Sequence, residues 1–273
     1  MTQRKIAFIG AGNMAKAIIA GLVGSGYPAT HIMATAPTDQ HLLPLAKNYG
    51  INTSNDNHEA VQQADVVVLA VKPQLMAEVC HLFQDIDFSQ KLVISIAAGI
   101  SCQRLREMLE APNLNLVRVM PNTPALLNQG MSGLFATEQV SEADQTFTTS
   151  LFQSVGEVCW VNNESQMNGI IAAAGSAPAY FFLFMEAMQK EAIAQGFDQD
   201  TARLLVQQSA MGAAAMVKAN PETELATLRE QVTSKGGTTA EAIRTFNEHD
   251  LSELVAQAMQ AAVKRAEAME KQF

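Results

Sequence analysis

The chain has 273 residues, of which 48% are hydrophobic and 16% are charged, and its formal net charge at pH 7 is −9. A chain of this length fits one large domain or two moderate ones with a substantial buried core. The acidic balance argues against a duplex nucleic-acid surface, which requires clustered Lys and Arg.

In the first half of the chain, short β-rich runs alternate with segments whose apolar residues recur every three or four positions. The expected strands cover residues 6–9, 32–35, 66–71, 92–96 and 116–120, and shorter runs at 133–136 and 158–161 are expected to add edge strands. Near-continuous apolar strands joined by helices are typical of a parallel sheet that is covered on both faces.

After about residue 162 the strand pattern disappears, and Ala, Met, Gln and Glu dominate. Helices are expected near 165–195, 199–218, 222–233, 239–247 and 250–271. The predicted organisation is a Rossmann-type doubly wound α/β domain over residues 1–163, followed by an all-α dimerisation domain over residues 164–273. Segments such as "SAMGAAAMV" are apolar on more than one helical face, which favours a dimer over a core within one chain.

Three further features bear on compartment and metal binding. The N-terminal "MTQRKIAFIGAGN" lacks the apolar region of a signal peptide. The apolar stretch 169–188 is interrupted by Gly175, Ser176 and Pro178, which favours a buried helix over a membrane span. The three cysteines are scattered and the five histidines lack the i, i+4 spacing of helical metal ligands. We therefore expect buried thiols, no metal site and a cytoplasmic protein.

The stretch "IAFIGAGNMAKAIIAGL" places Gly10, Gly12 and Ala15 between a predicted strand and a predicted helix. This GxGxxA spacing is a permitted form of the dinucleotide-binding fingerprint, with the pyrophosphate at the helix N-terminus. Gly10 would allow the tight turn, and Gly12 would let the backbone approach the pyrophosphate. Glycines also make ordinary strand-to-helix turns, but the position in the first βαβ unit favours nucleotide binding.

The end of the second predicted strand bears on the choice of nucleotide. NAD sites usually carry Asp or Glu there to bind the ribose 2′-OH, whereas this chain has Ala34 and Thr35. A 2′-phosphate would meet no like charge, and Thr35 and Thr38 could donate hydrogen bonds to it. The missing carboxylate therefore predicts NADPH. Because no Arg is present in this loop to bind the 2′-phosphate, NADH stays possible as a weaker alternative. Asp39 is interpreted as a helix cap.

Three more strand ends carry small or rigid residues, in "LAVKP" (69–73), "SIAAG" (95–99) and "VMPNTP" (119–124). Ligands of open α/β sheets bind beyond the carboxyl ends of the strands, so we expect a nicotinamide pocket there, although Pro and Gly also punctuate ordinary loops. Asn122 offers both a donor and an acceptor. Lys72 is the one ionisable side chain on these loops, and it fits a solvated lysine as well as a catalytic one.

The stretch "VTSKGGTTAEAIRTF" opens a late helix with two glycines and two threonines. Thr238 followed by Glu241 predicts a capping box, with the helix starting at Thr238 or Thr239. The two preceding glycines would leave the amides of 237–239 open, which together with the helix dipole makes a carboxylate site without an Arg. Thr239 would place a hydroxyl beside that anion. A capped helix after a flexible loop is the alternative.

This stretch closely resembles the signature of the Δ1-pyrroline-5-carboxylate reductases. The sequences "IAFIGAGNMAKAIIAGL", "AVKP", "SIAAGIS", "VMPNTPAL" and "GSAPAYFF" resemble further motifs of that family and occur in family order, from residue 6 to about residue 265. The resemblance implies a Rossmann domain and a helical domain that interlocks into homodimers, often assembled into decamers. It implies reduction of Δ1-pyrroline-5-carboxylate, a cyclic imino acid, to L-proline with NADPH.

The resemblance also implies individual site residues. The cofactor would be lined by Ile9, Gly10, Ala11, Gly12, Asn13, Met14, Ala15, Thr35, Asn57, Ala70, Val71, Lys72, Pro73, Ala97, Ala98 and Gly99. The substrate would be bound by Ser234, Gly236, Gly237, Thr238 and Thr239, while Glu164 occupies a position that lies close to proline in some relatives. We expect Thr239 to be the catalytic residue, through a hydrogen bond to the imine nitrogen.

The chain departs from the family pattern in two places. The usual "SPGGTT" reads "SKGGTT", with Lys235 for Pro, and "SGSGPAY" reads "AAGSAPAY", with Ala174 and Ala177 for Ser and Gly. Two alternatives stay open. An imine reductase or β-hydroxyacid dehydrogenase would normally carry a catalytic lysine in the helical domain, where Lys190 and Lys218 lack the required flanking pattern. A non-catalytic NADP sensor would need no carboxylate site.

Overall fold

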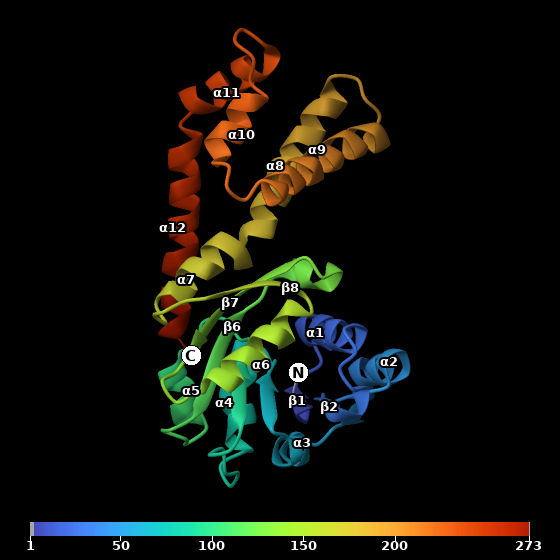
Figure 1. The fold of residues 1–273 in the computed structure, drawn as a ribbon, viewed down its shortest axis with the longest axis vertical. Helices are drawn as coiled ribbons and strands as arrows, with labels where there is room; N and C mark the ends of the chain where they lie inside the picture. The colour runs from blue at the N-terminus through green and yellow to red at the C-terminus, as the bar shows by residue number, and fades with distance from the viewer. Residues whose placement is uncertain (1–2, 273) are drawn as a thin grey trace. The chain divides into compact units, whose positions relative to one another are not determined.

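The structure is a computed structural model that describes residues 3–272 (Figure 1). The chain divides into two compact units. Unit 1 comprises Met1–Ser176 together with Ala262–Phe273, and unit 2 comprises Ala177–Ala261. The predicted division between residues 163 and 164 stays a prediction, and in the structure residues 164–176 belong with the sheet of unit 1.

Unit 1 is built on a sheet with the strand order β3-β2-β1-β4-β5-β6-β7-β8 in the described part of the chain. The strands are β1 Ile6–Ile9, β2 Ile32–Thr35, β3 Asn52–Ser54, β4 Val66–Leu69, β5 Leu92–Ser95, β6 Asn115–Met120, β7 Gly130–Ala136 and β8 Gly156–Trp160. Strands β1 to β6 are parallel, β7 is antiparallel to β6, and β8 is parallel to β7. The first six strands have the Rossmann order, and sheets of this order bind ligands where the strand order reverses, here at β1 and β4.

The sequence predicts each strand of this sheet except β3, but several bounds differ. β7 and β8 begin earlier than expected, at Gly130 and Gly156, and β6 begins at Asn115. β4 and β5 end slightly earlier than expected, at Leu69 and Ser95. The sequence does not predict β3, because its three residues are polar and lie at the edge of the sheet, where no apolar pattern is required. β7 is not an edge strand, contrary to expectation, because it lies between β6 and β8. The prediction of an edge strand is correct for β8.

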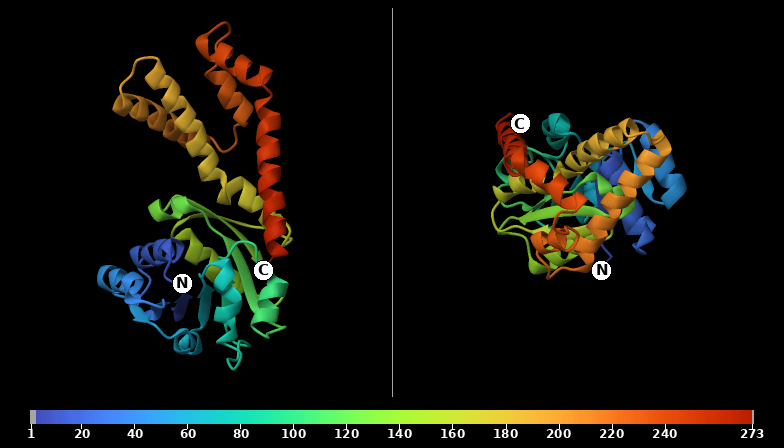
Figure 2. Two further views of the ribbon diagram at one scale, coloured as in Figure 1. Left: turned by 180° about the vertical axis from the view of Figure 1, so that it is seen from behind. Right: turned by 90° about the horizontal axis from the view of Figure 1, so that it is seen from above.

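Helices cover both faces of the sheet (Figures 1 and 2). One face carries α1 (Asn13–Gly24), α2 (Asp39–Tyr49) and α6 (Glu142–Gln153), and the other carries α3 (Asn57–Gln63), α4 (Met76–His81) and α5 (Cys102–Met108). Alternation along each strand produces the two cores, since Phe8 of β1 points into the first and Ile9 into the second. The expected parallel arrangement with two covered faces is confirmed for β1 to β6.

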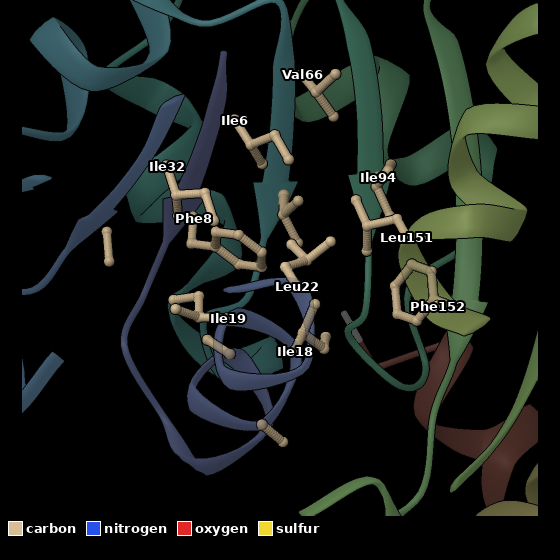
Figure 3. Packing of buried hydrophobic residues seen from close by; sticks show 14 of the residues in the cluster. Ile6, Phe8, Ile18, Ile19, Leu22, Ile32, Val66, Ile94, Leu151 and Phe152 are labelled. Carbon is tan, nitrogen blue, oxygen red and sulfur yellow. The ribbon is translucent and has the colours of Figure 1, made fainter. Parts of the chain in front are cut away.

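The first core fixes the start of α1. Figure 3 shows side chains of β1, α1, β2, β4, β5 and α6 gathered on this face of the sheet. Ile18, Ile19 and Leu22 lie at helical spacing on α1, and each is fully buried. Burial of an aliphatic side chain of this size contributes about 1.5–3 kcal/mol. Three such side chains hold α1 against the sheet, with its N-terminus directly after β1.

Apart from the end of the last helix, from Ala262 onward, the other described elements of unit 1 are short turns and two helical segments. The 3-10 turns are η1 (Ala29–His31), η2 (Pro73–Leu75) and η3 (Thr123–Leu127), and the helical segments are α7 (Gln166–Ile170) and the π-helical turn η4 (Ile171–Gly175). A Cβ on Gly133 of β7 would lie 2.5 Å from Ile170 Cγ2. Glycine at this position therefore lets α7 approach β7 closely.

Unit 2 is helical, as predicted. It contains α8 (Ala177–Ala194), α9 (Gln199–Ala219), α10 (Leu225–Gln231), α11 (Thr238–Glu248) and the N-terminal part of α12 (Leu251–Glu270). The segment 166–194 is continuously helical, so α7, η4 and α8 together form the first predicted helix. The sequence places the beginning of α10 three residues too early.

Unit 2 buries little of its own apolar surface. Ala202 and Val206 are the hydrophobic residues that it buries among those described. Large apolar side chains stay exposed on its helices, and Phe181, Leu183 and Met211 are 67%, 68% and 62% exposed. Exposed apolar surface of this extent marks an interaction surface, as expected for a helical half that packs against a second subunit.

Candidate active site

The turn after β1 requires glycine at its first position. Gly10 has a φ of +105°, and a Cβ there would lie 2.7 Å from the carbonyl oxygen of Ala70, so any other residue would be strained and obstructed. Gly12 is the N-cap residue of α1, and a Cβ on it would meet no atom of the described chain within 4 Å. The backbone at Gly12 is therefore open, as the approach of a pyrophosphate to the start of α1 requires.

The end of β2 brings together two residues that the sequence assigns to the cofactor. Thr35 is fully buried. Its hydroxyl oxygen lies 2.6 Å from Asn57 Oδ1 and 3.3 Å from the carbonyl oxygen of Phe8. Both neighbours are acceptors, so the hydroxyl hydrogen of Thr35 is used inside the protein. Thr35 positions Asn57, and the exposed Thr38 is the hydroxyl left for a phosphate.

Asp39 is not the cap of α2, contrary to expectation. The N-cap residue is Thr38, whose side chain makes no capping hydrogen bond, and Asp39 is the first helical residue. The carboxylate of Asp39 accepts a hydrogen bond from Asn55 Nδ2 at 3.2 Å, and the same amide group donates to the carbonyl oxygen of Ala36 at 3.0 Å. Through Asn55, Asp39 therefore stabilises the loop that follows β2.

The loops after β4 and β5 begin at the sheet edge where the glycine turn lies. The amide of Ala70 donates to the carbonyl oxygen of Ile9 at 2.9 Å. The amide of Ile96 likewise donates to the carbonyl oxygen of Leu69 at 3.2 Å, so the pairing continues past the strand ends. Lys72 is exposed, which fits the interpretation as a solvated lysine.

The loop after β5 also depends on a glycine. Gly99 has a φ of +73°, and a Cβ there would lie 2.8 Å from Cβ of Met269. At the start of the loop, the amide of Ala97 donates to Ser95 Oγ at 3.4 Å. Residues 97–99 thus form a tight turn that has the C-terminal end of α12 directly against it.

Asn122, after β6, does not offer free groups to a ligand. Its side chain is buried, Nδ2 donates to the carbonyl oxygen of Ala174 at 3.0 Å, and Oδ1 accepts from the amide of Met131 at 2.9 Å. The donor and the acceptor that the sequence suggests for the nicotinamide pocket are both used to join β7 and η4 to the end of β6.

The entry of α11 in unit 2 also requires glycine. α11 begins at Thr238, within the predicted range, and Gly237 is its N-cap residue. Gly236 has a φ of +73°, and a Cβ on Gly237 would lie 2.5 Å from Ser234 Oγ. Thr238 and Thr239 are both exposed. The two glycines therefore form a tight turn that presents the first residues of the helix.

The predicted capping box at this entry is wrong. No side chain of the described chain caps α11, and the carboxylate of Glu241 instead accepts from Arg244 Nη2 at 2.8 Å and Nε at 3.1 Å. The amide of Gly237 is not open either, because it donates to the carbonyl oxygen of Ser234 at 3.0 Å. The amides without a carbonyl partner inside the helix are those of Thr238, Thr239 and Ala240. The open amides at this helix entry therefore lie one residue further along the chain than expected.

Glu164 belongs to unit 1, whereas residues 234–239 belong to unit 2. Its carboxylate accepts from the amide of Cys102 at 2.7 Å and from Arg118, which is 3% exposed. The sequence predictions overlook Arg118, although a charge inside the apolar strand "NLVRVM" signals a buried ion pair. Arg118 Nη1 and Nη2 also donate to Glu270 Oε1 at 3.3 Å.

Cys80 and Cys102 are buried thiols on α4 and α5, as predicted, and Cys159 is half-buried. Burial raises the pKa of Cys80 to about 12. Burial, helped by the charge of Glu164, also raises the pKa of Cys102 well above the ordinary thiol value. Both thiols stay protonated at neutral pH and are poor nucleophiles. Within residues 3–272, no group of three or more His, Cys, Asp or Glu could hold a metal ion.

A Rossmann sheet with an open glycine turn before α1 defines a dinucleotide-binding protein. The second unit adds an uncapped helix entry suited to an anion and an exposed apolar surface suited to a partner subunit. Together the two units have the plan of a dinucleotide-dependent oxidoreductase that works as an oligomer.

Comparison with known proteins gives the particular family. Residues 164–269 match the family model described as pyrroline-5-carboxylate reductase dimerisation, and residues 5–99 match that described as NADP oxidoreductase, coenzyme F420-dependent. The chain is 68% identical to the pyrroline-5-carboxylate reductase of Vibrio alginolyticus, over 100% of each chain. It belongs to the pyrroline-5-carboxylate reductase family, as the sequence motifs predict.

Solved structures of relatives have the same fold over their full length. A pyrroline-5-carboxylate reductase from Coxiella burnetii superposes with a TM-score of 0.93 at 40% identity, covering 98% of this chain and 99% of that chain. A pyrroline carboxylate reductase from Plasmodium falciparum with NADP bound gives a TM-score of 0.87 at 27% identity, covering 99% of each chain. These matches confirm the predicted fold of a Rossmann-type domain followed by a helical domain.

The region matched by the dimerisation model contains a long apolar helix. Among the described residues, the helix 166–194 is long and apolar enough to cross a membrane, and 6% of its apolar window is buried. Length and composition are weak evidence for a membrane span. This helix lies within the region matched by the dimerisation model, which indicates an oligomer and is consistent with its exposed apolar side chains.

Proposed function

We propose that this protein reduces Δ1-pyrroline-5-carboxylate to L-proline with hydride from NADPH, the last step of proline synthesis. The names of its relatives and the NADP bound to the Plasmodium falciparum protein support this reaction. Within the structure, the proposal rests on the entry of α11. Three helical amides there have no carbonyl partner and no side-chain cap, and the two threonines are exposed, which is the environment that a carboxylate ligand needs.

The residues present in unit 1 fit NADPH. The open backbone at Gly12 and the first amides of α1 would hold the pyrophosphate. The end of β2 offers no carboxylate to repel a 2′-phosphate, so we expect NADH to be the weaker cofactor, with Thr38 as a phosphate donor and Asn57 at the adenine-side ribose. Residues 70–73 and 97–99 would line the nicotinamide end. When bound, NADPH supplies the hydride.

In unit 2, the amides of Thr238, Thr239 and Ala240 would hold the substrate carboxylate, with Ser234 and the two glycines shaping the turn before them. The Thr239 hydroxyl would hydrogen-bond the imine nitrogen and hold its proton in place, which keeps the adjacent carbon electrophilic. For Glu164, its contacts with Arg118 and the Cys102 amide favour a structural role over the predicted contact with substrate.

We infer a homodimer formed through the helices of unit 2, because their exposed apolar side chains need a partner surface. Assembly of dimers into decamers rests on the family resemblance. The acidic charge of −9 and the small polar substrate support a cytoplasmic enzyme with neither nucleic-acid nor membrane partners.

The reaction is tested by following NADPH oxidation by the purified protein with and without Δ1-pyrroline-5-carboxylate, with NADH in parallel. We expect oxidation that depends on substrate, that is faster with NADPH, and that yields one proline per NADPH. Tight NADPH binding without oxidation by any cyclic imino acid would favour the sensor instead. Turnover confined to imines other than the proposed substrate would favour an imine reductase.

A further inference from the structure

Arg118 connects three segments of unit 1 that lie far apart in the sequence. Its buried guanidinium donates to Glu164, just before α7, and to Glu270 at the end of α12. Asn168 of α7 adds a second contact, since its Nδ2 donates to Glu270 Oε2 at 3.3 Å. A charged side chain inside a sheet costs free energy unless carboxylates compensate it. This network therefore ties the C-terminal end of the chain to the centre of the sheet.

The same network holds both ends of the loop between β5 and α5. At the start of the loop, Ser95 is the register partner of Arg118 in the β5–β6 pair. At its end, the amide of Cys102 donates to Glu164, which is itself bound by Arg118. The loop therefore begins beside Arg118 and ends at a carboxylate that Arg118 fixes.

The end of α12 also contacts the middle of this loop. A Cβ on Gly99 would lie 2.8 Å from Cβ and 3.2 Å from Cε of Met269, so the glycine backbone and the methionine side chain are in close contact. Met269 and Glu270 are adjacent at the last turn of α12, where one packs on the loop and the other binds Arg118. Figure 1 shows this end of α12 beside α5, the helix that follows the loop.

We propose that the last turn of α12 is a positioning element for the nicotinamide end of the cofactor. Glu270 holds that turn on Arg118, and Met269 presses the loop of residues 96–101 into the conformation that receives the nicotinamide. Neither side chain would touch the reacting atoms, so both are positioning residues. The inference rests on the proposed function, because it takes residues 97–99 as part of the NADPH site.

The test compares two ligands that share the adenine end of the cofactor. NADPH carries the nicotinamide, and adenosine 2′,5′-bisphosphate lacks it. Glu270→Ala leaves the Arg118–Glu164 pair in place, and Glu270 is 25% exposed in its side chain, so the variant should fold. Glu270→Gln keeps an oxygen that accepts from Arg118. Glu267→Ala is the matched control, since it removes the same charge from an exposed position of the same turn.

We expect Glu270→Ala to raise the Kd for NADPH by about tenfold, the effect of ordering one or two side chains on binding. Its Kd for adenosine 2′,5′-bisphosphate should equal that of the wild type. Glu270→Gln should recover part of the loss, and Glu267→Ala should match the wild type for both ligands.

Two results would overturn this inference while leaving the proposed function intact. Wild-type NADPH affinity in Glu270→Ala would mean that the end of α12 does not position the loop. Equal weakening of both ligands would mean that the variant damages unit 1 as a whole. Failure of the wild type to bind NADPH would instead remove the proposed function, and the inference with it.

Discussion

The hydroxyl of Thr239 is the side-chain group on which the proposed chemistry depends most. It is exposed in the first turn of α11 and takes no part in capping that helix. Thr239→Val keeps the shape and the backbone amide but removes the hydrogen bond to the imine nitrogen. We expect kcat to fall about 10- to 1000-fold, with a smaller change in KM because the carboxylate keeps its amides. Steady-state NADPH oxidation measures both.

Thr245 provides the control for this substitution. It lies on the same helix, and its hydroxyl donates to the carbonyl oxygen of Glu241 at 3.0 Å. Thr245→Val should keep wild-type kcat. Wild-type turnover in Thr239→Val would remove Thr239 from the mechanism.

Gly10 is the residue whose backbone conformation the cofactor site needs most directly. In Gly10→Ala the new Cβ would face the Ala70 carbonyl oxygen at 2.7 Å with φ at +105°. We expect a loss of stability of about 1–3 kcal/mol from the strained backbone, together with weaker NADPH binding. Gly24→Ala is the control, because a Cβ there meets nothing within 4 Å in the described chain. Thermal unfolding and NADPH titration give the two quantities, and unchanged NADPH affinity in Gly10→Ala would contradict the proposed site.

At the level of elements, α11 must hold its N-terminus still to bind a carboxylate. Phe246 of α11 packs on Phe184 of α8, with ring centroids 5.8 Å apart and planes inclined by 42°. An aromatic pair contributes about 0.5–1.5 kcal/mol beyond its buried area, so Phe246→Ala should raise KM for the imino acid by about 2- to 10-fold. The Kd for NADPH serves as the internal control. It should not change, because the proposed NADPH site lies in unit 1. A KM equal to that of the wild type would mean that this contact does not position α11.

The elements that the sequence predicts well are those whose patterns are local. Apolar runs locate β1, β2, β4, β5 and β6, and helical periodicity locates the helices of unit 2. The capping box fails because a Thr-x-x-Glu pattern does not show what else binds the glutamate. Arg244, three residues later, takes the Glu241 carboxylate, and Gly237 in an extended conformation takes the N-cap position.

The residues of the candidate site likewise divide into those that a local pattern predicts and those that depend on contacts between distant segments. The glycine turns at residues 10–12 and 236–237 can be read from the sequence, because each is a demand of the local backbone. The ion pairs of Arg118 cannot be predicted from the sequence, because Glu164 and Glu270 lie 46 and 152 residues away from it in the chain. The hydrogen bond of the Thr35 hydroxyl cannot be predicted for the same reason, since its partner Asn57 lies at the start of α3.

For the whole molecule, the exposed apolar surface of unit 2 predicts an obligate oligomer. Sedimentation should give twice the chain mass of 29.4 kDa for a dimer. If five dimers assemble into a decamer, it should give ten times the chain mass. Leu183→Asp on α8 should weaken the dimer by about 3–5 kcal/mol, because it buries an unpaired charge at the interface.

The control for the interface is Leu43→Asp. Leu43 lies on α2 of unit 1 and is 65% exposed, close to the 68% of Leu183. This variant should keep the wild-type mass. A monomeric wild type, or equal effects of the two substitutions, would contradict an interface formed by unit 2.

Because unit 2 buries so little apolar surface on its own, we expect its folding, and the carboxylate site proposed at α11, to depend on the partner subunit. Dilution to concentrations where the oligomer dissociates should therefore abolish turnover before unit 1 unfolds.

We propose that this enzyme selects its substrate through a carboxylate bound at the start of α11. The most direct measurement compares kcat/KM for Δ1-pyrroline-5-carboxylate and 1-pyrroline, which has the same cyclic imine and no carboxylate, with NADPH in both cases. Two charge-assisted hydrogen bonds contribute about 3–6 kcal/mol together, so we expect 1-pyrroline to be at least about 100-fold poorer. Equal kcat/KM values for the two imines would contradict the claim.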